Sequence, residues 1–232
     1  AANCGRKQRL YLPLLLPIFI ALFSLELLAH IMLYPGGGAA SSLLPQLCFS
    51  LAYALAVYAA GSLFSPRLNY ALIVAVIGLF AFLVMVQYGY FQVFRTPFLL
   101  YSLTRAADAM DYSAEAWHMI IQHIPQFLLF ALPGILLALF ARGRSPRLPR
   151  RHSLLLLLAA TLAFLLALGS LSLDGKAPAS AYSSYYNENS PAIAQEKLGL
   201  LTSMRLDLQR NLFGFTPREQ PAPVELPPPP PE

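Results

Sequence analysis

Five long apolar runs alternate with short polar stretches along most of the chain. The runs cover residues 10–33, 43–64, 70–94, 120–141 and 153–173. A helix needs roughly 20 apolar residues to cross a hydrocarbon layer about 30 Å thick, and each run reaches that length. Backbone amides find no water at that depth, and the alternation typical of membrane barrel strands is absent from the sequence. The pattern therefore predicts an all-α polytopic membrane protein, with five transmembrane helices within residues 10–173.

Two further segments are periodic but too polar to cross a membrane. At about 98–117, apolar residues including Trp117 share one helical face, and acidic residues share the other with His118. This pattern predicts a helix that lies at the outer interface. Residues 192–213 regain helical spacing beyond the last run, which predicts an amphipathic juxtamembrane helix.

The remaining segments complete the expected organisation. Residues 1–9 form a basic cytoplasmic N-terminus, and 174–191 are small and polar without a helical period, which predicts an extended linker. Together with the juxtamembrane helix, this linker makes an extracytoplasmic segment at 174–215. The proline-rich residues 216–232 favour a semi-rigid polyproline II spacer.

Composition and charge place the chain in a membrane and give it a direction. The sequence is 57% hydrophobic and 12% charged, against about 45–50% and about 25% in an average soluble domain. With the N-terminus inside, the inner segments hold no acidic residue and nine basic ones: Arg6, Lys7, Arg9, Arg67, Arg142, Arg144, Arg147, Arg150 and Arg151. The positive-inside rule therefore predicts a multi-pass plasma-membrane protein with its C-terminal tail extracytoplasmic. The cluster at 142–151 is expected to meet anionic lipids, and no nucleic-acid partner is expected.

Two ionisable residues lie within the first run. Glu26 and His30 are one helical turn apart, on one face. A charged group at the bilayer centre costs roughly 2.5–3.5 kcal/mol on insertion scales, so such residues usually face the bundle interior. Two interpretations stay open for this intramembrane pair. It relays protons or grips a lipid headgroup, or a neutral Glu26 hydrogen-bonds to His30 or to a neighbouring helix and holds the bundle together.

Candidate ligand-binding residues outside the runs are few. Arg95 and Arg105 lie at the outer face, where a guanidinium suits a lipid phosphate, although snorkelling to the interface explains them equally well. The polar face of the interfacial segment consists of Asp108, Asp111, Glu115 and His118. Exposure to solvent explains this face best, so no metal site is predicted there. The sequence lacks a nucleophile elbow, a zinc-protease motif and a Walker loop, and no catalytic residue is predicted.

Three features together carry a resemblance to a known family. They are the five-helix plan with an outer tail, the aromatic exit of the third run at 88–98, and the juxtamembrane Leu-Gly-Leu-Leu-Thr-Ser at 198–203 that continues to Phe-Gly-Phe at 213–215. The chain resembles the N-terminal membrane domain of lipoteichoic acid synthase-like phosphoglycerol transferases, in the alkaline phosphatase and sulfatase superfamily. The resemblance covers most of the chain and includes no catalytic motif.

The resemblance implies a function that this chain serves without performing the chemistry. In that family an extracytoplasmic domain, with a threonine nucleophile and a divalent ion such as Mn²⁺ or Mg²⁺, transfers phosphoglycerol from phosphatidylglycerol. The chain would then be the membrane anchor of such a domain, which is missing from this sequence or separate, and membrane lipids would be its partners. Alternatives are a stand-alone lipid-handling or transport protein that uses Glu26 and His30, or an anchor for a separate partner.

Overall fold

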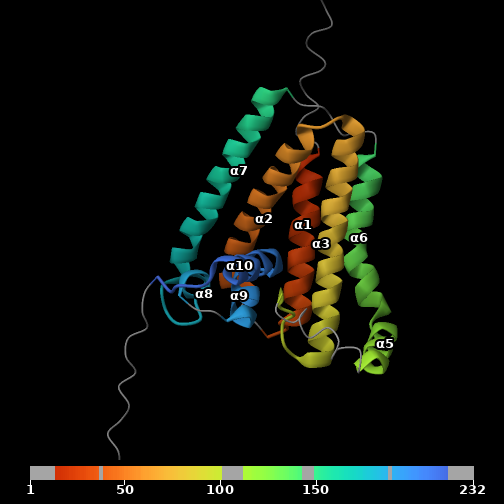
Figure 1. Ribbon diagram of the computed structural model, residues 1–232, viewed down its shortest axis with the longest axis vertical. Helices are drawn as coiled ribbons and strands as arrows, with labels where there is room; N and C mark the ends of the chain where they lie inside the picture. The colour runs from red at the N-terminus through yellow and green to blue at the C-terminus, as the bar shows by residue number, and fades with distance from the viewer. Residues whose placement is uncertain (1–13, 37–38, 101–111, 143–148, 188–189, 219–232) are drawn as a thin grey trace, which may run out of the picture.

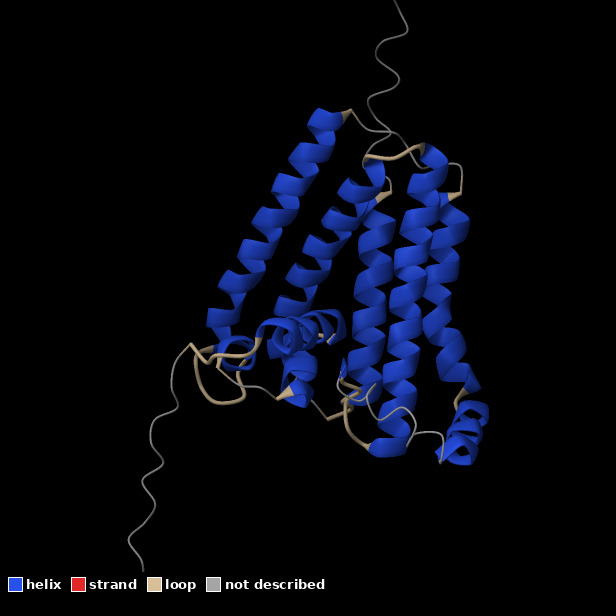
Figure 2. Ribbon diagram, in the orientation of Figure 1, coloured by secondary structure: helices blue, strands red, loops and turns tan. Residues whose placement is uncertain are grey.

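Five helices long and apolar enough to cross a membrane form the body of the molecule, as the hydrophobic pattern predicts. The computed structural model describes residues 14–36, 39–100, 112–142, 149–187 and 190–218, and within these ranges it contains helices and loops but no strand (Figures 1 and 2). The five long helices are α1 (Leu15–Leu33), α2 (Ala39–Ser62), α3 (Pro66–Phe94), α6 (Ile124–Ala141) and α7 (Arg150–Ser170). An all-helical fold with five candidate membrane spans is confirmed for the described residues.

The shorter elements gather at the end of the bundle where α1 and α3 finish (Figure 1). They are α5 (Ser113–Gln122), the 3₁₀-helix η4 (Leu171–Asp174), α8 (Ala181–Tyr186), α9 (Pro191–Leu198) and α10 (Leu200–Phe213). In Figure 1, α10 runs across the long helices, at the level of the lower parts of α1 and α2. We call α9 and α10 together the tail segment, and this end of the bundle the tail end.

The bundle is built around α1, which contacts α2, α3 and α6. Its buried face includes Ile18, Leu22 and Leu25, each at most 1% exposed, and they join one core with Ile73 and Ile77 of α3. By contrast α7 packs mainly on α2 and turns a row of leucines outward, such as Leu158 and Leu166, which are 66% and 63% exposed. A row of apolar side chains so exposed suits contact with lipid, which is consistent with the predicted spans.

Local sequence signals explain where the long helices begin and end. Ser65 is extended and precedes Pro66 at the first position of α3, where proline's missing N–H costs nothing. The same helix ends at Arg95, whose left-handed backbone (φ 57°) lets its N–H reach the Phe91 carbonyl. Pro149 likewise precedes α7. The span boundaries of the structure therefore follow the breaks in the apolar runs closely.

Outside the spans, the structure differs from the sequence-based expectation at two points. The linker 174–191 was expected to be extended, but it contains α8, because the Ser180 hydroxyl caps that helix by accepting from the Ser183 amide at 3.1 Å. The juxtamembrane helix expected at 192–213 is two helices, α9 and α10, separated by Gly199 with φ 89°. Each difference reflects a local cap or break that hydrophobic periodicity does not report.

The interfacial segment is described only in part. Residues 97–99 are not helical, and α5 occupies 113–122, further along the chain than the expected 98–117. Residues 101–111, with Arg105, Asp108 and Asp111, lie outside the described residues. Trp117 of α5 is 65% exposed, as expected for an aromatic side chain at a membrane interface.

Candidate functional site

The most unusual group of residues is a buried polar cluster that joins the tail segment to the long helices. Glu26 of α1 is 3% exposed, and its two carboxylate oxygens accept hydrogen bonds from the backbone amides of Leu200 at 2.6 Å and Leu201 at 2.7 Å. These amides begin α10, where the first N–H groups of a helix have no partner within the helix and the helix dipole favours an acidic group. Glu26 therefore supplies the N-terminal cap of a helix that lies 174 residues further along the chain.

This contact lies within the membrane-spanning part of α1. Glu26 stands seven residues before Leu33, the last residue of the helix, which corresponds to roughly 10 Å along its axis. The beginning of α10 therefore lies inside the bundle, further from its tail end than the last residue of α1 and level with the long helices. At such a depth an unpaired backbone amide costs several kcal/mol, so the carboxylate meets a need that water cannot.

A glycine makes this close approach possible. Gly199, between α9 and α10, has φ 89°, in the left-handed region that residues with a side chain rarely adopt. A Cβ atom at this position would lie 2.6 Å from Glu26 Oε2 and 3.1 Å from Gln46 Cγ. The sequence break at Gly199 and the carboxylate of Glu26 thus form one structural device.

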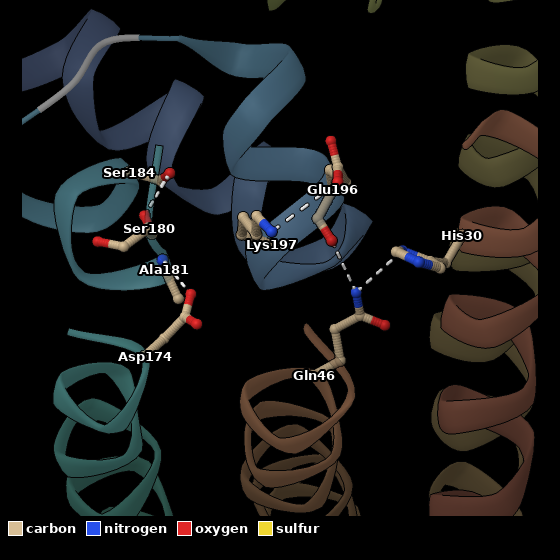
Figure 3. Close-up of polar contacts among 8 residues, drawn as sticks. All are labelled: His30, Gln46, Asp174, Ser180, Ala181, Ser184, Glu196 and Lys197. Carbon is tan, nitrogen blue, oxygen red and sulfur yellow. Dashed lines mark hydrogen bonds and ion pairs between the residues drawn. The ribbon is translucent and has the colours of Figure 1, made fainter. Parts of the chain in front are cut away.

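His30 and Gln46 extend the cluster by one helical turn (Figure 3). The Gln46 side-chain amide of α2 lies 3.3 Å from His30 Nδ1, and it donates to the backbone carbonyl of Glu196 at 3.1 Å. Both side chains are at most 5% exposed. Glu26 therefore binds the tail segment directly. His30 contacts Gln46, which in turn binds the tail segment.

Two further residues complete what we call the docking cluster, namely Glu26, His30, Tyr34, Gln46 and Gln87. The Tyr34 hydroxyl donates to Gln195 Oε1 at 3.0 Å, and the Gln87 amide donates to the same oxygen at 3.1 Å. Burial raises the pKa of Tyr34, and nearby Glu196 raises it further, so the phenol keeps the proton it donates. The cluster thus draws on α1, α2 and α3 to bind α9 and α10.

The tail segment is also tied to α8. The Arg205 guanidinium donates to the Tyr185 hydroxyl at 2.8 Å, and Arg210 donates to the Ser184 carbonyl at 3.0 Å. The 3₁₀-helix η4 joins this group, because Asp174 accepts from the Ala181 amide at 3.2 Å (Figure 3). The elements α8, α9 and α10 thus form one folded unit on the tail end of the bundle.

The predicted lipid-headgroup residues are placed only in part. Arg95 is exposed at the end of α3, beside a cavity of about 700 Å³ that Glu115, His118 and Gln122 of α5 also line. This position at the tail end is compatible with a headgroup contact. Arg105 lies outside the described residues, so the pairing of the two arginines stays a prediction.

The aromatic exit of α3 connects that helix to α5 and α6. The Tyr88 hydroxyl lies 2.9 Å from His123 Nδ1, at the start of α6, and the Tyr88 ring packs edge-on against Phe127. Further along, Phe94 packs edge-on against Tyr112, just before α5. These contacts give the aromatic residues of the 88–98 motif a structural role between α3 and its neighbours.

The cluster offers binding chemistry rather than bond-breaking chemistry. Its groups are a carboxylate, an imidazole, a phenol and amides. The carboxylate, the phenol and the amides bind backbone and side-chain groups of the tail segment. No three His, Cys, Asp or Glu side chains come together as a metal site within the described residues.

Sequence analysis singled out Glu26 and His30 but not the partners that give them a role. Gln46, Gln87 and Gln195 carry the signal that was available, since each is a polar amide in an otherwise apolar or amphipathic segment. A polar residue in a membrane span usually faces a partner within the protein. What the sequence does not indicate is that the partner is the tail segment.

Comparison with known proteins adds no family to this picture. Neither protein-family models, nor curated proteins, nor solved structures give a match to the chain.

Proposed function

We propose that this chain is the membrane domain that anchors and positions a lipoteichoic acid synthase-like phosphoglycerol transferase at the outer face of the plasma membrane. The observation that carries the proposal is the docking cluster. It fixes the beginning of α10 through two hydrogen bonds that Glu26 accepts, so the segment that leads out of the membrane leaves the bundle from one defined place. A flexible tether would need no such site.

Charge supports the proposed direction of the chain. The exposed Arg67, Arg142 and Arg151 lie at the beginning of α3, just after α6 and at the beginning of α7, which is the end of the bundle opposite the tail segment (Figure 1). The positive-inside rule assigns that end to the cytoplasm. The tail segment would then lie at the outer face, where donor lipids with outward headgroups are within reach.

The proposed reaction needs the anchor for geometry, not for chemistry. In phosphoglycerol transfer, the bond between the donor phosphorus and the diacylglycerol oxygen breaks, and a bond from that phosphorus to an acceptor hydroxyl oxygen forms. The acceptor's proton passes to the released diacylglycerol. A divalent ion and a nucleophile in the extracytoplasmic domain would supply this chemistry. Holding that domain at a fixed height above the bilayer raises the local concentration of the donor.

A transfer assay with the protein from the complete reading frame tests this function. The protein is placed in vesicles that contain phosphatidylglycerol with a fluorescent acyl chain, with Mn²⁺ present. We expect fluorescent diacylglycerol to accumulate and EDTA to stop it. If no diacylglycerol forms with Mn²⁺ or Mg²⁺, the transferase assignment is wrong.

A substitution in the docking cluster separates positioning from chemistry. Glu26→Leu removes the acceptor for the α10 amides. We expect it to lower the transfer rate from vesicle phosphatidylglycerol about tenfold, as expected when a bound reactant is misplaced, while a water-soluble phosphodiester is still cleaved at the original rate. Thr161→Leu in α7 is the control, because it also replaces a polar side chain by leucine but lies outside the docking cluster and bonds only to Leu157 of its own helix. Equal loss with both substrates would contradict a positioning role.

Labelling of single cysteines tests the direction of the chain. In a background without Cys4 and Cys48, we expect Ala177→Cys to react with a membrane-impermeant maleimide in intact cells. Ser65→Cys, at the opposite end of the bundle, should react only after lysis. The reverse pattern would place the tail segment in the cytoplasm and exclude the proposed function.

A further inference from the structure

We propose that the cavity between α3 and the tail segment binds an uncharged glycerolipid with a free hydroxyl, of the diacylglycerol class. The cavity measures about 500 Å³ and lies between the α3 residues 82–87, the stretch 97–100 and the tail segment. This volume is within the range of roughly 300–1,000 Å³ that ligand sites usually have. The proposal concerns lipid binding alone, so its test is independent of the proposed transferase function.

The apolar part of the cavity opens beside the membrane-spanning helix α3. Leu83 and Val86 line it from that helix, and Leu201 and Met204 line it from α10. Phe82 and Leu208, which are 59% and 47% exposed, also belong to its lining and mark the open side. Because α3 crosses the hydrocarbon layer, the molecules that reach such an opening first are lipids with acyl chains.

Two buried glutamines form the polar part of the lining. Gln87 is 2% exposed and Gln195 is 3% exposed. Gln87 donates to Gln195 Oε1, yet Gln87 Oε1 and Gln195 Nε2 have no hydrogen-bond partner. If the nitrogen and oxygen positions of the two amides are exchanged, at least one donor and one acceptor still lack a partner. Buried amides normally find partners, so this pair is equipped for a group that the protein itself does not supply.

The chemistry of this pair selects the ligand. A hydroxyl both donates and accepts, so a single hydroxyl can accept from Gln195 Nε2 and donate to Gln87 Oε1. An ionised phosphate only accepts, and it would leave the acceptor oxygen unpaired. Of the charged residues of the lining, Arg205 donates to Tyr185 and Gln209 through its terminal nitrogens while its Nε has no hydrogen-bond partner, and Asp207 accepts from the Leu100 amide at 2.8 Å. The glutamine pair therefore fits a lipid hydroxyl next to acyl chains, and a headgroup without a hydroxyl would leave Gln87 Oε1 unpaired.

Photolabelling with matched lipids tests the site. The full chain in detergent micelles is exposed to a diacylglycerol with a photoreactive group in one acyl chain, and labelled peptides are mapped by mass spectrometry. We expect the label on residues 82–87 and 201–208. Unlabelled diacylglycerol should compete about tenfold better than its O-methyl ether, which has the same chains but cannot donate, because one lost hydrogen bond corresponds to about that factor. Phosphatidylcholine, whose headgroup has no hydroxyl, should compete no better than the ether.

Two variants keep the test independent of any single substitution. Leu83→Trp fills the apolar part of the cavity and should reduce labelling at least tenfold, whereas Leu136→Trp on the exposed face of α6 should not change it. Gln87→Leu removes the acceptor and should abolish the preference for diacylglycerol over the ether. The proposal is overturned if both lipids compete equally in the wild type. It is also overturned if the label spreads over α3, α6 and α7 alike, since the cavity would then hold only water or unspecific lipid.

Discussion

Two parts of this molecule are attached to the bundle with different shares of polar contact. The helix α7 packs on α2 through small apolar residues, with Ala160 and Ala163 against Ala52 and Leu55. The tail segment also buries apolar side chains, with Leu198 and Leu206 in one core with Phe49 of α2, but it adds a carboxylate, a phenol and side-chain amides. Lipid chains are as apolar as alanine and leucine, so apolar contact alone does not favour protein over lipid, whereas a paired polar group does. Directional hydrogen bonds therefore help to specify the position of the tail segment, whereas the packing of side chains specifies the position of α7.

Removal of the Glu26 carboxylate is expected to weaken the attachment of the tail segment more than any other substitution considered below. Glu26→Leu leaves the amides of Leu200 and Leu201 buried without an acceptor. Hydrogen bonds to charged groups are worth about 1.5–3 kcal/mol each, so we expect the docked state of the tail segment to lose about 3 kcal/mol or more. Hydrogen exchange at these two amides measures this directly. Unchanged protection would mean that the carboxylate does not hold α10, and Thr161→Leu serves as the control.

A pair of glycine substitutions separates the close approach from the backbone conformation. Gly199 and Gly214 have similar φ values of 89° and 79°, but only Gly199 faces Glu26, and nothing lies within 4 Å of a Cβ at Gly214. With ψ values of 165° and 173°, both glycines adopt an extended backbone with positive φ, which costs a residue with a side chain roughly 1–3 kcal/mol. We expect Gly214→Ala to cost about 1 kcal/mol, and Gly199→Ala about 1–2 kcal/mol more because the added methyl displaces the carboxylate. Thermal unfolding of the two variants gives the comparison, and equal losses would contradict it.

A weaker effect is expected from Gln46. Its amide contacts His30 and donates to the Glu196 carbonyl, so Gln46→Leu removes two neutral contacts and leaves that carbonyl without this donor. Interhelical hydrogen bonds in membrane proteins average about 0.6 kcal/mol, which predicts a loss of roughly 1 kcal/mol. Protease cleavage between α9 and α10 reports the release of the tail segment. Cleavage as rapid as in Glu26→Leu would place the main attachment at Gln46 instead.

The sequence predicts the spans well because hydrophobic length is a sufficient signal for them. Each of the five predicted runs overlaps one of the five candidate membrane-spanning helices, with ends that differ by a few residues. The basis of this success is general, since every backbone amide in lipid must be satisfied within a helix. The intramembrane polarity of Glu26 and His30 was equally visible in the sequence.

The partners of these residues were not predictable in the same way. Glu26 binds backbone amides, which every residue except proline carries, so nothing in the side chains of Leu200 and Leu201 identifies them. Helical periodicity treated 192–213 as one helix because Gly199 lies between apolar residues that continue the pattern. An isolated glycine in a helical pattern was the available warning. Its position next to the carboxylate is visible only once the fold is known.

The smallest expected effect concerns a polar contact between α7 and α2. The Ser62 and Ser153 hydroxyls lie 2.8 Å apart, and Ser62 also donates to the Ala59 carbonyl of its own helix at 2.7 Å. A double-mutant cycle with Ser62→Ala and Ser153→Ala isolates the contact between the helices. We expect a coupling of about 0.6 kcal/mol, the average for such bonds in membranes, measured from unfolding in mixed micelles. A coupling as large as that between Glu26 and α10 would show that α7 also depends on a directional polar bond, and the contrast between the two attachments would no longer hold.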